Sequence, residues 1–453
     1  MDYNVKSVAC IGAGYVGAPT TTIMARFCPD VKFTVVDINQ ARIDAWNSDK
    51  LPIYEPGLHE LVMQIRNRNL FFSTDVVGAI KESQIIFVCV NTSTKTYGLD
   101  AGAAYDLTAV EVVARTIAEV DAGQKIVVEK STVPVTTADR IQKVFKACKA
   151  DGRMEVLSNP EFLAEGQAIK NLEHPDRVLI GCRQTPKGRA AEQALSHLYQ
   201  KWIPESKIIT TNVWSSELAK LAANAFLAQR ISSINAISAI CEKTGADVQE
   251  VARVVGTDTR IGEKFLRAGV GFGGSCFRKD LLGLVYLARS FQLEEVADYW
   301  NQVLLMNEYR KERFVRTVME EMFGTICGKH IAILGFAFKA NTGDTRDSPA
   351  ITVMERIVAE KAKVHVYDPK VDHAEIIEMF PGTTVHTDAY AACKDAHAIL
   401  VLTDWDEFLN LDFKRIYADM KRPAFLFDGR TFLDHKYLDD IGFCTHAIGK
   451  GKL

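Results

Sequence analysis

The stretch Gly12-Ala13-Gly14-Tyr15-Val16-Gly17 decides how the first part of this chain folds. The short apolar run from Val5 to Ile11 precedes it, and an apolar helix is predicted from Ala18 to Phe27. A second strand, Phe33 to Val36, ends at Asp37, about 20 residues after the last glycine. Strand, glycine-rich turn, helix, strand and acid in this order indicate a βαβ unit that binds a dinucleotide.

Each part of this unit has a physical role. Gly12 permits the tight turn, Gly14 lets a pyrophosphate approach the backbone, and Gly17 lets the helix pack closely. Asp37 can accept hydrogen bonds from ribose hydroxyls and would repel a 2′-phosphate, which favours NAD over NADP. Arg42 either lies over the adenine ribose or is a solvated surface charge. A glycine-rich turn without a ligand is the alternative for the whole unit.

Two more buried-type strands are predicted, each leading into a polar turn. The run Ile85 to Val90 leads into Asn91-Thr92-Ser93-Thr94, and Lys125 to Glu129 leads into Lys130-Ser131-Thr132-Val133-Pro134. Open α/β sheets bind their ligands at the carboxyl ends of strands. We therefore expect both turns at the cofactor site.

A pair of acids follows the next strand, Met154 to Leu157. Glu161 and Glu165 lie in the stretch from Ser158 to Gly166, four residues apart, and we expect them on one face of a helix start. Like charges at this spacing repel each other, which indicates a functional use. The alternative is that both acids stabilise the positive end of the helix dipole.

One long helix is predicted from Trp214 to Glu242, ending near Gly245. Its length suits an interdomain spine or a dimer interface. Lys220 and Asn224 are one turn apart among small apolar residues, so they point together into a pocket or along a wet edge.

The stretch from Gly271 to Asp280 brings three glycines in four residues before Ser275, a candidate helix N-cap. Cys276 is expected in the first helical turn, where the helix dipole favours a thiolate. Asp280 follows four residues later on the same face. This setting is typical of a nucleophile, whereas most free cysteines are small buried apolar residues.

The last third of the sequence repeats the α/β pattern after Gly324. A strand from His330 to Leu334 runs into Gly335-Phe336-Ala337-Phe338-Lys339. The later strands are Val364 to Tyr367, ending at Asp368, then Ala398 to Leu402 and Phe425 to Phe427. Because the glycine fingerprint is incomplete, we expect a nucleotide here but no second dinucleotide. Lys339, Arg346 and Arg430 follow strand ends and either meet phosphates or are surface charges.

The composition excludes several classes of protein. The chain has 453 residues, 47% of them hydrophobic and 25% charged, with a net charge of -3. These values are typical of a globular protein with two or three domains, and they favour neither a nucleic acid nor a membrane as partner. The ten cysteines form no CxxC pair, and the N-terminus lacks a signal-peptide pattern. We expect no metal site and a reduced, cytoplasmic setting.

Taken together, these motifs resemble the UDP-glucose/GDP-mannose dehydrogenase family, and within it the UDP-glucose 6-dehydrogenases of the animal type. The resemblance extends from about Val5 to Gly449. It rests on Gly12–Gly17, Tyr54-Glu55-Pro56-Gly57-Leu58, Ser158–Gly166, Asn212–Asn235, Gly271–Asp280 and Gly335–Lys339. It implies two Rossmann-like, doubly wound α/β domains joined by a long central helix, with the active site in the cleft between them. The implied boundaries are 1–212 for NAD binding, 213–323 for the central helices and 324–453 for the UDP-sugar.

The resemblance also implies the reaction: the C6 hydroxyl of UDP-glucose is oxidised to a carboxylate while two NAD are reduced. It makes Cys276 the nucleophile that captures the aldehyde and then carries a thioester. Lys220 and Asn224 would stabilise oxyanions at C6, and Lys220 is a candidate for taking the first proton. Asp280 and Thr132 would position water.

The remaining site residues are implied in the same way. Glu161 would act in hydrolysis, Glu165 and Arg346 would line the site near the cofactor, and Arg260 would reach the substrate of a neighbouring subunit. The cofactor set is Gly12, Gly14, Tyr15, Val16, Gly17, Asp37, Arg42, Val90, Asn91, Thr92, Thr94, Ser131, Thr132, Glu165 and Arg346. The substrate set is Glu161, Phe162, Leu163, Glu165, Lys220, Asn224, Arg260, Lys264, Phe265, Arg267, Phe272, Gly273, Cys276, Phe277, Phe338, Lys339 and Arg430.

The resemblance implies a homo-oligomer, a hexamer built from dimers, with inhibition by UDP-xylose as a further hypothesis. A dehydrogenase of another sugar nucleotide, such as GDP-mannose or a UDP-N-acetylhexosamine, is the nearest alternative. It would share Cys276 and Lys220, and the stretch Glu161–Gly166 favours UDP-glucose over it. An inactive NAD-binding scaffold is an alternative of another class, and measured turnover separates the two.

Overall fold

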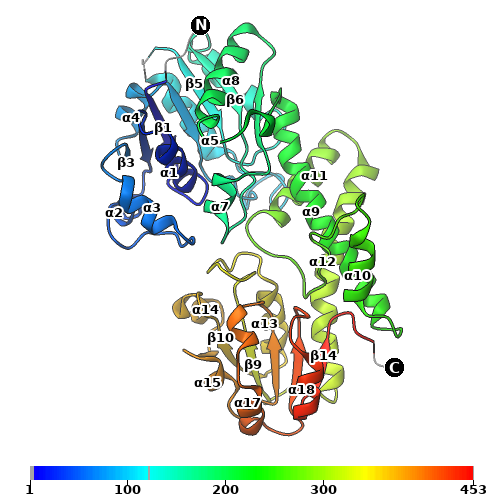
Figure 1. Cartoon of the computed structure of the whole chain (residues 1–453). Helices are drawn as coiled ribbons and strands as arrows, with labels where there is room; N and C mark the ends of the chain where they lie inside the picture. The colour runs from blue at the N-terminus through cyan, green and yellow to red at the C-terminus, as the bar shows by residue number, and fades with distance from the viewer. Residues whose placement is uncertain (1–4, 121–122, 452–453) are drawn as a thin grey trace. The chain divides into compact units, whose positions relative to one another are not determined.

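A computed structural model of the chain describes residues 5–120 and 123–451. It divides into two compact units. The first unit comprises the residues up to Ala223 together with Leu282–Phe291, and the second comprises Asn224–Leu281 together with the residues from Gln292 onward. Each unit contains one sheet (Figure 1).

The first sheet has eight strands. In spatial order they are β3 (Leu70–Ser73), β2 (Lys32–Val36), β1 (Ser7–Ile11), β4 (Ile85–Val88), β5 (Lys125–Glu129), β6 (Met154–Ser158), β7 (Val178–Cys182) and β8 (Ile208–Asn212). Neighbouring strands are parallel except β6 and β7, which pair antiparallel at Ser158 and Gly181. The order of β1 to β6 is that of a Rossmann fold, in which the strand order reverses between β1 and β4.

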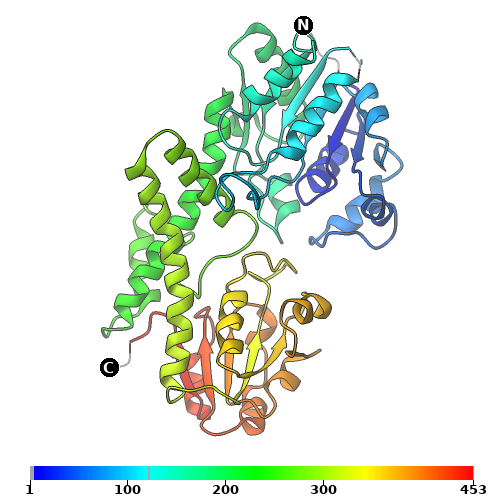
Figure 2. The ribbon, with the colours of Figure 1, turned by 180° about the vertical axis from the view of Figure 1, so that it is seen from behind.

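Helices cover both faces of this sheet, and β1 shows why. Val8 and Cys10 contribute to one buried cluster, and Ala9 and Ile11 contribute to the other, because successive side chains of a strand point to opposite faces. Figures 1 and 2 view the two helical layers from opposite sides. One layer holds α1 (Gly17–Phe27), α3 (Leu58–Ile65), α7 (Ala168–Glu173) and α8 (Pro186–Tyr199). The other holds α4 (Val76–Glu82), α5 (Thr108–Glu119) and α6 (Thr137–Ala147).

The second sheet has six strands, all parallel to their neighbours. Their order is β11 (Thr384–Val385), β10 (Lys363–Tyr367), β9 (His330–Leu334), β12 (Ala398–Val401), β13 (Phe425–Asp428) and β14 (Cys444–Ala447). The order repeats that of β1 to β6, with β9 in the place of β1. Its helices are α13 (Pro349–Ala359), α14 (His373–Met379), α15 (Ala389–Cys393), α16 (Asp406–Leu409), α17 (Phe413–Asp419) and α18 (His435–Ile441). The predicted pair of Rossmann-like folds is confirmed.

Further helices lie between the two sheets in the sequence. They are α9 (Val213–Cys241), α10 (Val248–Thr257), α11 (Phe277–Ser290) and α12 (Glu294–Glu321), of which α9 and α12 are the longest of the described chain. The predicted long helix agrees with α9 to within one residue at each end, and the division between the units falls inside α9 and inside α11. Within the described residues, no helix is both long enough and apolar enough to cross a membrane. The short helix α2 (Gln40–Trp46) follows Asp37.

Candidate active site

The turn after β1 is built for a ligand. Gly12 has φ +111°, and a Cβ there would lie 2.3 Å from the carbonyl oxygen of Cys89. A Cβ on Gly17 would lie 2.2 Å from the Gly12 carbonyl oxygen, so the chain itself requires both glycines. A Cβ on Gly14 would meet no atom within 4 Å. This open space lets a pyrophosphate approach the backbone closely. No side chain caps α1, whose N-terminal N–H groups can therefore face phosphates. These residues fit a dinucleotide.

Asp37 directly follows β2 and is 8% exposed. Its Oδ2 accepts from the Ala13 N–H and from Arg42 Nη1, both at 3.0 Å, and its Oδ1 accepts from the Asn39 N–H at 2.9 Å. Burial alone would raise the pKa of Asp37, but the two N–H groups and the Arg42 guanidinium outweigh it and hold the pKa below its usual value. Asp37 is therefore a carboxylate with lone pairs left for ribose hydroxyls.

The polar turns after β4 and β5 are tied to each other. The Thr92 hydroxyl donates to the Thr132 carbonyl at 2.7 Å, and the Ser131 hydroxyl donates to the Val90 carbonyl at 2.7 Å. Thr92 and Ser131 are buried, so their hydroxyls shape the turns. The other cofactor candidates on these turns are all at least partly exposed: Val90, Asn91, Thr94 and Thr132.

The prediction that Glu161 and Glu165 share a helical face is wrong. Both acids lie in a loop, and α7 begins only at Ala168. The N–H groups of this loop donate to side-chain oxygens and not to helical carbonyls. Side chains satisfy backbone N–H groups in the same way at helix N-caps. The pairs are Phe162 N–H to Glu161 Oε1 and Ala164 N–H to Asn171 Oδ1, both at 2.9 Å, and Ala168 N–H to Glu55 Oε2 at 3.0 Å.

Glu55 gives the second quoted motif a structural role. Its carboxylate is 4% exposed and accepts from the Tyr15 hydroxyl as well as from the N–H groups of Gly166 and Ala168. Burial and the adjacent Glu55 carboxylate raise the pKa of Tyr15 well above its usual value, so its hydroxyl stays a donor. Glu55 thus joins the dinucleotide turn to the loop that carries Glu161.

The first unit brings Glu161, Phe162 and Lys220 together. Lys130 Nζ lies 2.9 Å from Glu161 Oε2. Lys220 Nζ lies 5.1 Å from the centre of the Phe162 ring, over which the Arg177 guanidinium also lies, at 3.9 Å. Lys220 is 6% exposed. Leu163 and Glu165 follow in the same loop, both partly exposed. Sequence reasoning assigned no role to Lys130, because its burial is not visible in the sequence.

In the second unit, the structure shifts the expected helix start by one residue. The helix α11 begins at Phe277, so Cys276 precedes it and its carbonyl accepts the Asp280 N–H at 2.9 Å. Cys276 therefore takes the cap position expected for Ser275, whose hydroxyl lies 3.4 Å from Cys276 Sγ. Cys276 is exposed at the positive end of the helix dipole. Such a position suits a reactive thiol.

Asp280 is fully buried one turn beyond Cys276. Its Oδ2 accepts from Asn224 Nδ2 at 2.5 Å, and Lys279 Nζ lies 3.2 Å from its Oδ1. The second unit therefore brings Cys276, Asp280 and Asn224 together, and their roles toward an oxyanion and a water stay predictions.

The glycines before Cys276 are required by close packing. A Cβ on Gly273 would lie 2.4 Å from the Asp347 carbonyl oxygen, and one on Gly274 would lie 2.8 Å from the Phe338 ring. The Phe272 N–H donates to Asn307 Oδ1 at 2.8 Å. The aromatic substrate residues pack edge to face, Phe272 on Phe277 at 5.7 Å and Phe265 on Phe277 at 6.4 Å.

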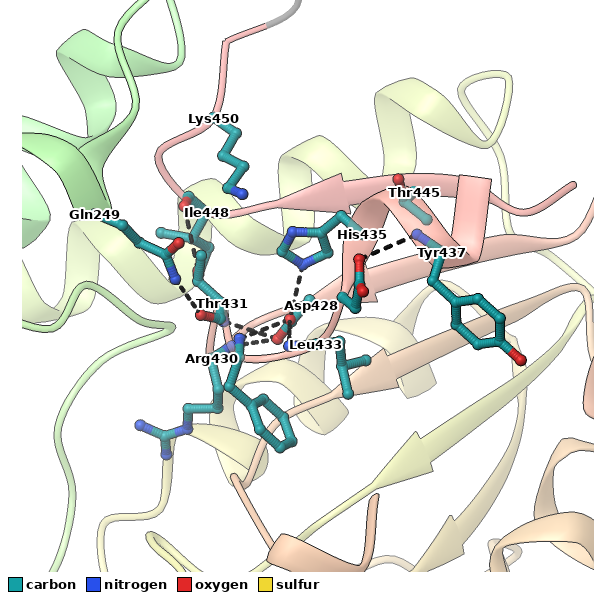
Figure 3. A network of polar contacts seen from close by, with 12 residues as sticks. Gln249, Asp428, Arg430, Thr431, Leu433, His435, Tyr437, Thr445, Ile448 and Lys450 are labelled. Carbon is teal, nitrogen blue, oxygen red and sulfur yellow. Dashed lines mark hydrogen bonds and ion pairs between the residues drawn. The ribbon is translucent and has the colours of Figure 1, made fainter. Parts of the chain in front are cut away.

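Arg430 follows β13, and three carbonyl oxygens hold it. It donates to Leu402 at 2.6 Å, to Phe338 at 2.8 Å and to Gly271 at 3.4 Å. Figure 3 shows what supports this turn: Asp428 accepts the N–H groups of Arg430, Thr431 and Leu433 and contacts His435 Nε2 at 2.9 Å. A guanidinium has five N–H groups, so Arg430 retains donors for a phosphate.

The other predicted cations of the second unit have neighbouring partners. Arg260 is 87% exposed and pairs with Asp258, and Arg346 pairs with Asp344, both at 2.6 Å. Their roles toward partner subunit and cofactor stay predictions. The other contacts are Arg267 with Asp404 at 3.0 Å, Lys339 over the Phe338 ring at 5.5 Å, and the Lys264 carbonyl with Arg230 at 2.8 Å.

A Rossmann unit that fits a dinucleotide, in a chain with a thiol at a helix start, defines an NAD-binding dehydrogenase. Three family models match in sequence: the NAD binding domain, the central domain and the UDP binding domain of the UDP-glucose/GDP-mannose dehydrogenase family, over residues 6–203, 214–309 and 332–435. The chain belongs to this family, as the motifs predict.

Within residues 5–120 and 123–451, no three His, Cys, Asp or Glu side chains are placed to hold a metal ion.

Curated relatives extend over nearly the whole chain. A UDP-glucose 6-dehydrogenase of Drosophila melanogaster is 56% identical, covering 98% of this chain and 96% of its own length. UDP-glucose 6-dehydrogenase 4 of Arabidopsis thaliana is 55% identical, covering 98% and 97%. Among solved structures, a UDP-glucose dehydrogenase from Pyrobaculum islandicum has a TM-score of 0.86 at 29% identity, covering 97% of this chain and 98% of that one.

Proposed function

We propose that the chain oxidises UDP-glucose to UDP-glucuronate through a covalent intermediate on Cys276. Bound NAD would supply the hydride acceptor for each of two oxidations at C6. After the first, the Cys276 thiolate adds to the C6 aldehyde, a carbon–sulfur bond forms and the carbonyl oxygen becomes an oxyanion. Lys220 and Asn224 donate to this oxyanion. Loss of a second hydride from C6 restores the carbonyl as a thioester.

Hydrolysis completes the sequence. Water adds to the thioester carbon, the carbon–sulfur bond breaks, and Cys276 is regenerated. One proton of the water passes to Glu161 and then to the leaving sulfur, and the acid formed releases the second to solvent. Asp280 and Thr132 orient the water, and Arg430 and Lys339 hold the UDP group.

Cys276 carries this proposal. It is exposed at the N-terminus of α11, with a buried Asp280 one turn away. Covalent capture explains the need for a thiol, because it retains the aldehyde for a second oxidation. The relatives named UDP-glucose 6-dehydrogenase support UDP-glucose as the substrate.

The test is the number of NADH formed per UDP-glucose consumed, for the native chain and for Cys276→Ser. We expect two in the native protein and no turnover in the variant. Cys327→Ser is the matched control, because Cys327 is also an exposed thiol and should not matter. One NADH per substrate, or an active Cys276→Ser variant, would contradict the covalent route. Turnover with a UDP-N-acetylhexosamine instead would move the proposal to another sugar nucleotide.

Assembly and location belong to the same proposal. We infer a hexamer built from dimers in which the exposed Arg260 reaches a neighbouring subunit's substrate, in a reducing cytoplasm that suits the free thiols. Light scattering on the enzyme used for turnover measures its mass, and a fully active monomer would refute the assembly. Recovery of the enzyme outside the cytosolic fraction of cells would refute the location.

A further inference from the structure

Lys130 is a buried cation directly after β5. It is 2% exposed and ranks among the largest fully buried side chains of the described residues. A buried ammonium group is destabilising unless hydrogen bonds and an opposite charge compensate it. Its Nζ donates to the carbonyl and to the side-chain oxygen of Asn159, both at 3.2 Å, and pairs with Glu161 Oε2 at 2.9 Å.

The same contacts fix the Glu161 carboxylate on both sides. Oε1 accepts the Phe162 N–H at 2.9 Å, and Oε2 faces Lys130. The Glu161 side chain is 16% exposed, whereas that of Lys130 is 1% exposed. The cation therefore lies beneath the carboxylate, which remains open to small molecules. The neighbouring Phe162 ring, under Lys220, places this carboxylate among the candidate catalytic groups.

Other titratable groups face Lys130, and two of them are held neutral. Burial raises the pKa of Tyr199 on α8, whose hydroxyl donates to Asn159 Oδ1 at 2.8 Å. Contact with Cys10 on β1 and burial raise the pKa of Cys89, which follows β4. Burial alone would lower the pKa of Lys130, but Glu161 outweighs it, and the pKa lies above its usual value.

From this arrangement we infer that Lys130 is a positioning residue that aims Glu161 for hydrolysis of the thioester. The inference rests on the proposed function, in which Glu161 takes a proton from water. The contacts of its two oxygens, with the Phe162 N–H and with Lys130 Nζ, hold the Glu161 carboxylate in one orientation. Lys130 touches neither substrate nor cofactor in this role.

The test is Lys130→Met, which removes the charge and keeps an unbranched side chain. We expect a burst of two NADH per active site followed by turnover slowed about tenfold or more, because hydrolysis becomes rate-limiting. Mass spectrometry of the intact protein should show the acyl group accumulating on Cys276.

Lys125→Met is the matched control. Lys125 lies at the other end of β5 and is also buried, with its Nζ donating to the carbonyls of Lys81 and Ser83. Losing it should destabilise the first unit to a similar degree without acyl accumulation. Lys130→Arg, which keeps a cation for Glu161, should accumulate no acyl group.

The outcomes separate the two proposals. If the native enzyme makes two NADH per UDP-glucose but Lys130→Met shows neither the burst nor acyl accumulation on Cys276, Lys130 has no such role. If Lys130→Met does not fold, Lys130→Gln replaces it, because an amide can still donate to Asn159 without a charge; the burst and the acyl accumulation then decide. A ratio of one NADH per UDP-glucose in the native enzyme would instead refute the covalent route itself.

Discussion

The two sheets share a strand order, yet they use the acid after the second strand differently. Asp37 follows β2 and accepts one N–H from the turn after β1, that of Ala13. Asp368 follows β10 and accepts two from the turn after β9, those of Phe336 and Ala337, at 2.7 and 3.0 Å. Asp368 also accepts from the N–H groups of Lys370 and Val371 and from Trp405 Nε1.

This difference explains how one fold serves two ligands. The N–H groups after β9 bind Asp368 within the chain, whereas the turn after β1 has an open space at Gly14 and an uncapped helix. The α13 helix in the second unit starts later, at Pro349, where Ser348 caps it. The fold therefore sets where a nucleotide binds, and the groups left available at each turn set which one.

The largest expected effect comes from Asp368→Ala. The change leaves five donors without their acceptor, four of them on buried residues, and we expect the free energy of unfolding of the second unit to fall by about 4 kcal/mol. Hydrogen exchange resolves the two units, and faster exchange should be confined to the second. Unchanged protection of β9 and β10 would mean that this acid does not hold the turn.

Asp37→Asn tests the other half of the comparison and should have a smaller effect. An amide loses the negative charge and one acceptor for the ribose hydroxyls, so NAD affinity should fall about tenfold. Calorimetric titration with NAD measures it. The control is Asp412→Asn, which also replaces a carboxylate that accepts a backbone N–H, at the start of α17 in the second unit. It should leave NAD affinity unchanged. Equal NAD affinities of the native and Asp37→Asn proteins would remove Asp37 from the cofactor site.

Sequence reasoning predicted the regular elements well because their signals are local. The Gly12–Gly17 turn and the ends of α9 depend on residues close in sequence, and both are confirmed. The loop with Glu161 was predicted wrongly because its N–H partners include Glu55, about a hundred residues earlier. Lys130 was overlooked for a similar reason: its partners, Asn159 and Glu161, follow the next strand. Such pairings form only when the sheet brings its strands together.

Buried carboxyl groups extend the comparison between the units. In the second unit, Asp428 is fully buried and accepts four backbone N–H groups and His435. In the first, Glu129 ends β5 at 1% exposure, and no hydrogen-bond donor of the described residues reaches either of its oxygens. It faces Glu217, which accepts the N–H groups of Thr136 and Ala138 at the start of α6.

The Glu129–Glu217 pair gives the smallest effect. Its pH dependence has the opposite sign to that of a carboxylate held by hydrogen-bond donors, such as Asp428. Burial and the Glu217 carboxylate raise the pKa of Glu129 well above its usual value. Between its pKa when unfolded and its pKa when folded, the native state holds a proton that the unfolded chain has lost. Stability conferred by this group is therefore present at low pH and falls as pH rises through that window. Asp428, whose pKa is lowered by His435 and N–H groups that outweigh burial, behaves in the reverse way.

Glu129→Gln should remove the slope, because the amide donates to Glu217 without ionising. We expect the variant to be as stable as the native protein near pH 5 and more stable by about 1 kcal/mol near pH 8. Hydrogen exchange in α6 at both pH values measures the difference. Titratable groups other than Glu129 and its neighbour Glu217 behave alike in both proteins, so their pH dependence cancels. Parallel stability curves of the two proteins would mean that Glu129 ionises in the folded state. The first unit would then hold a buried charge without the N–H donors that stabilise Asp428 in the second unit.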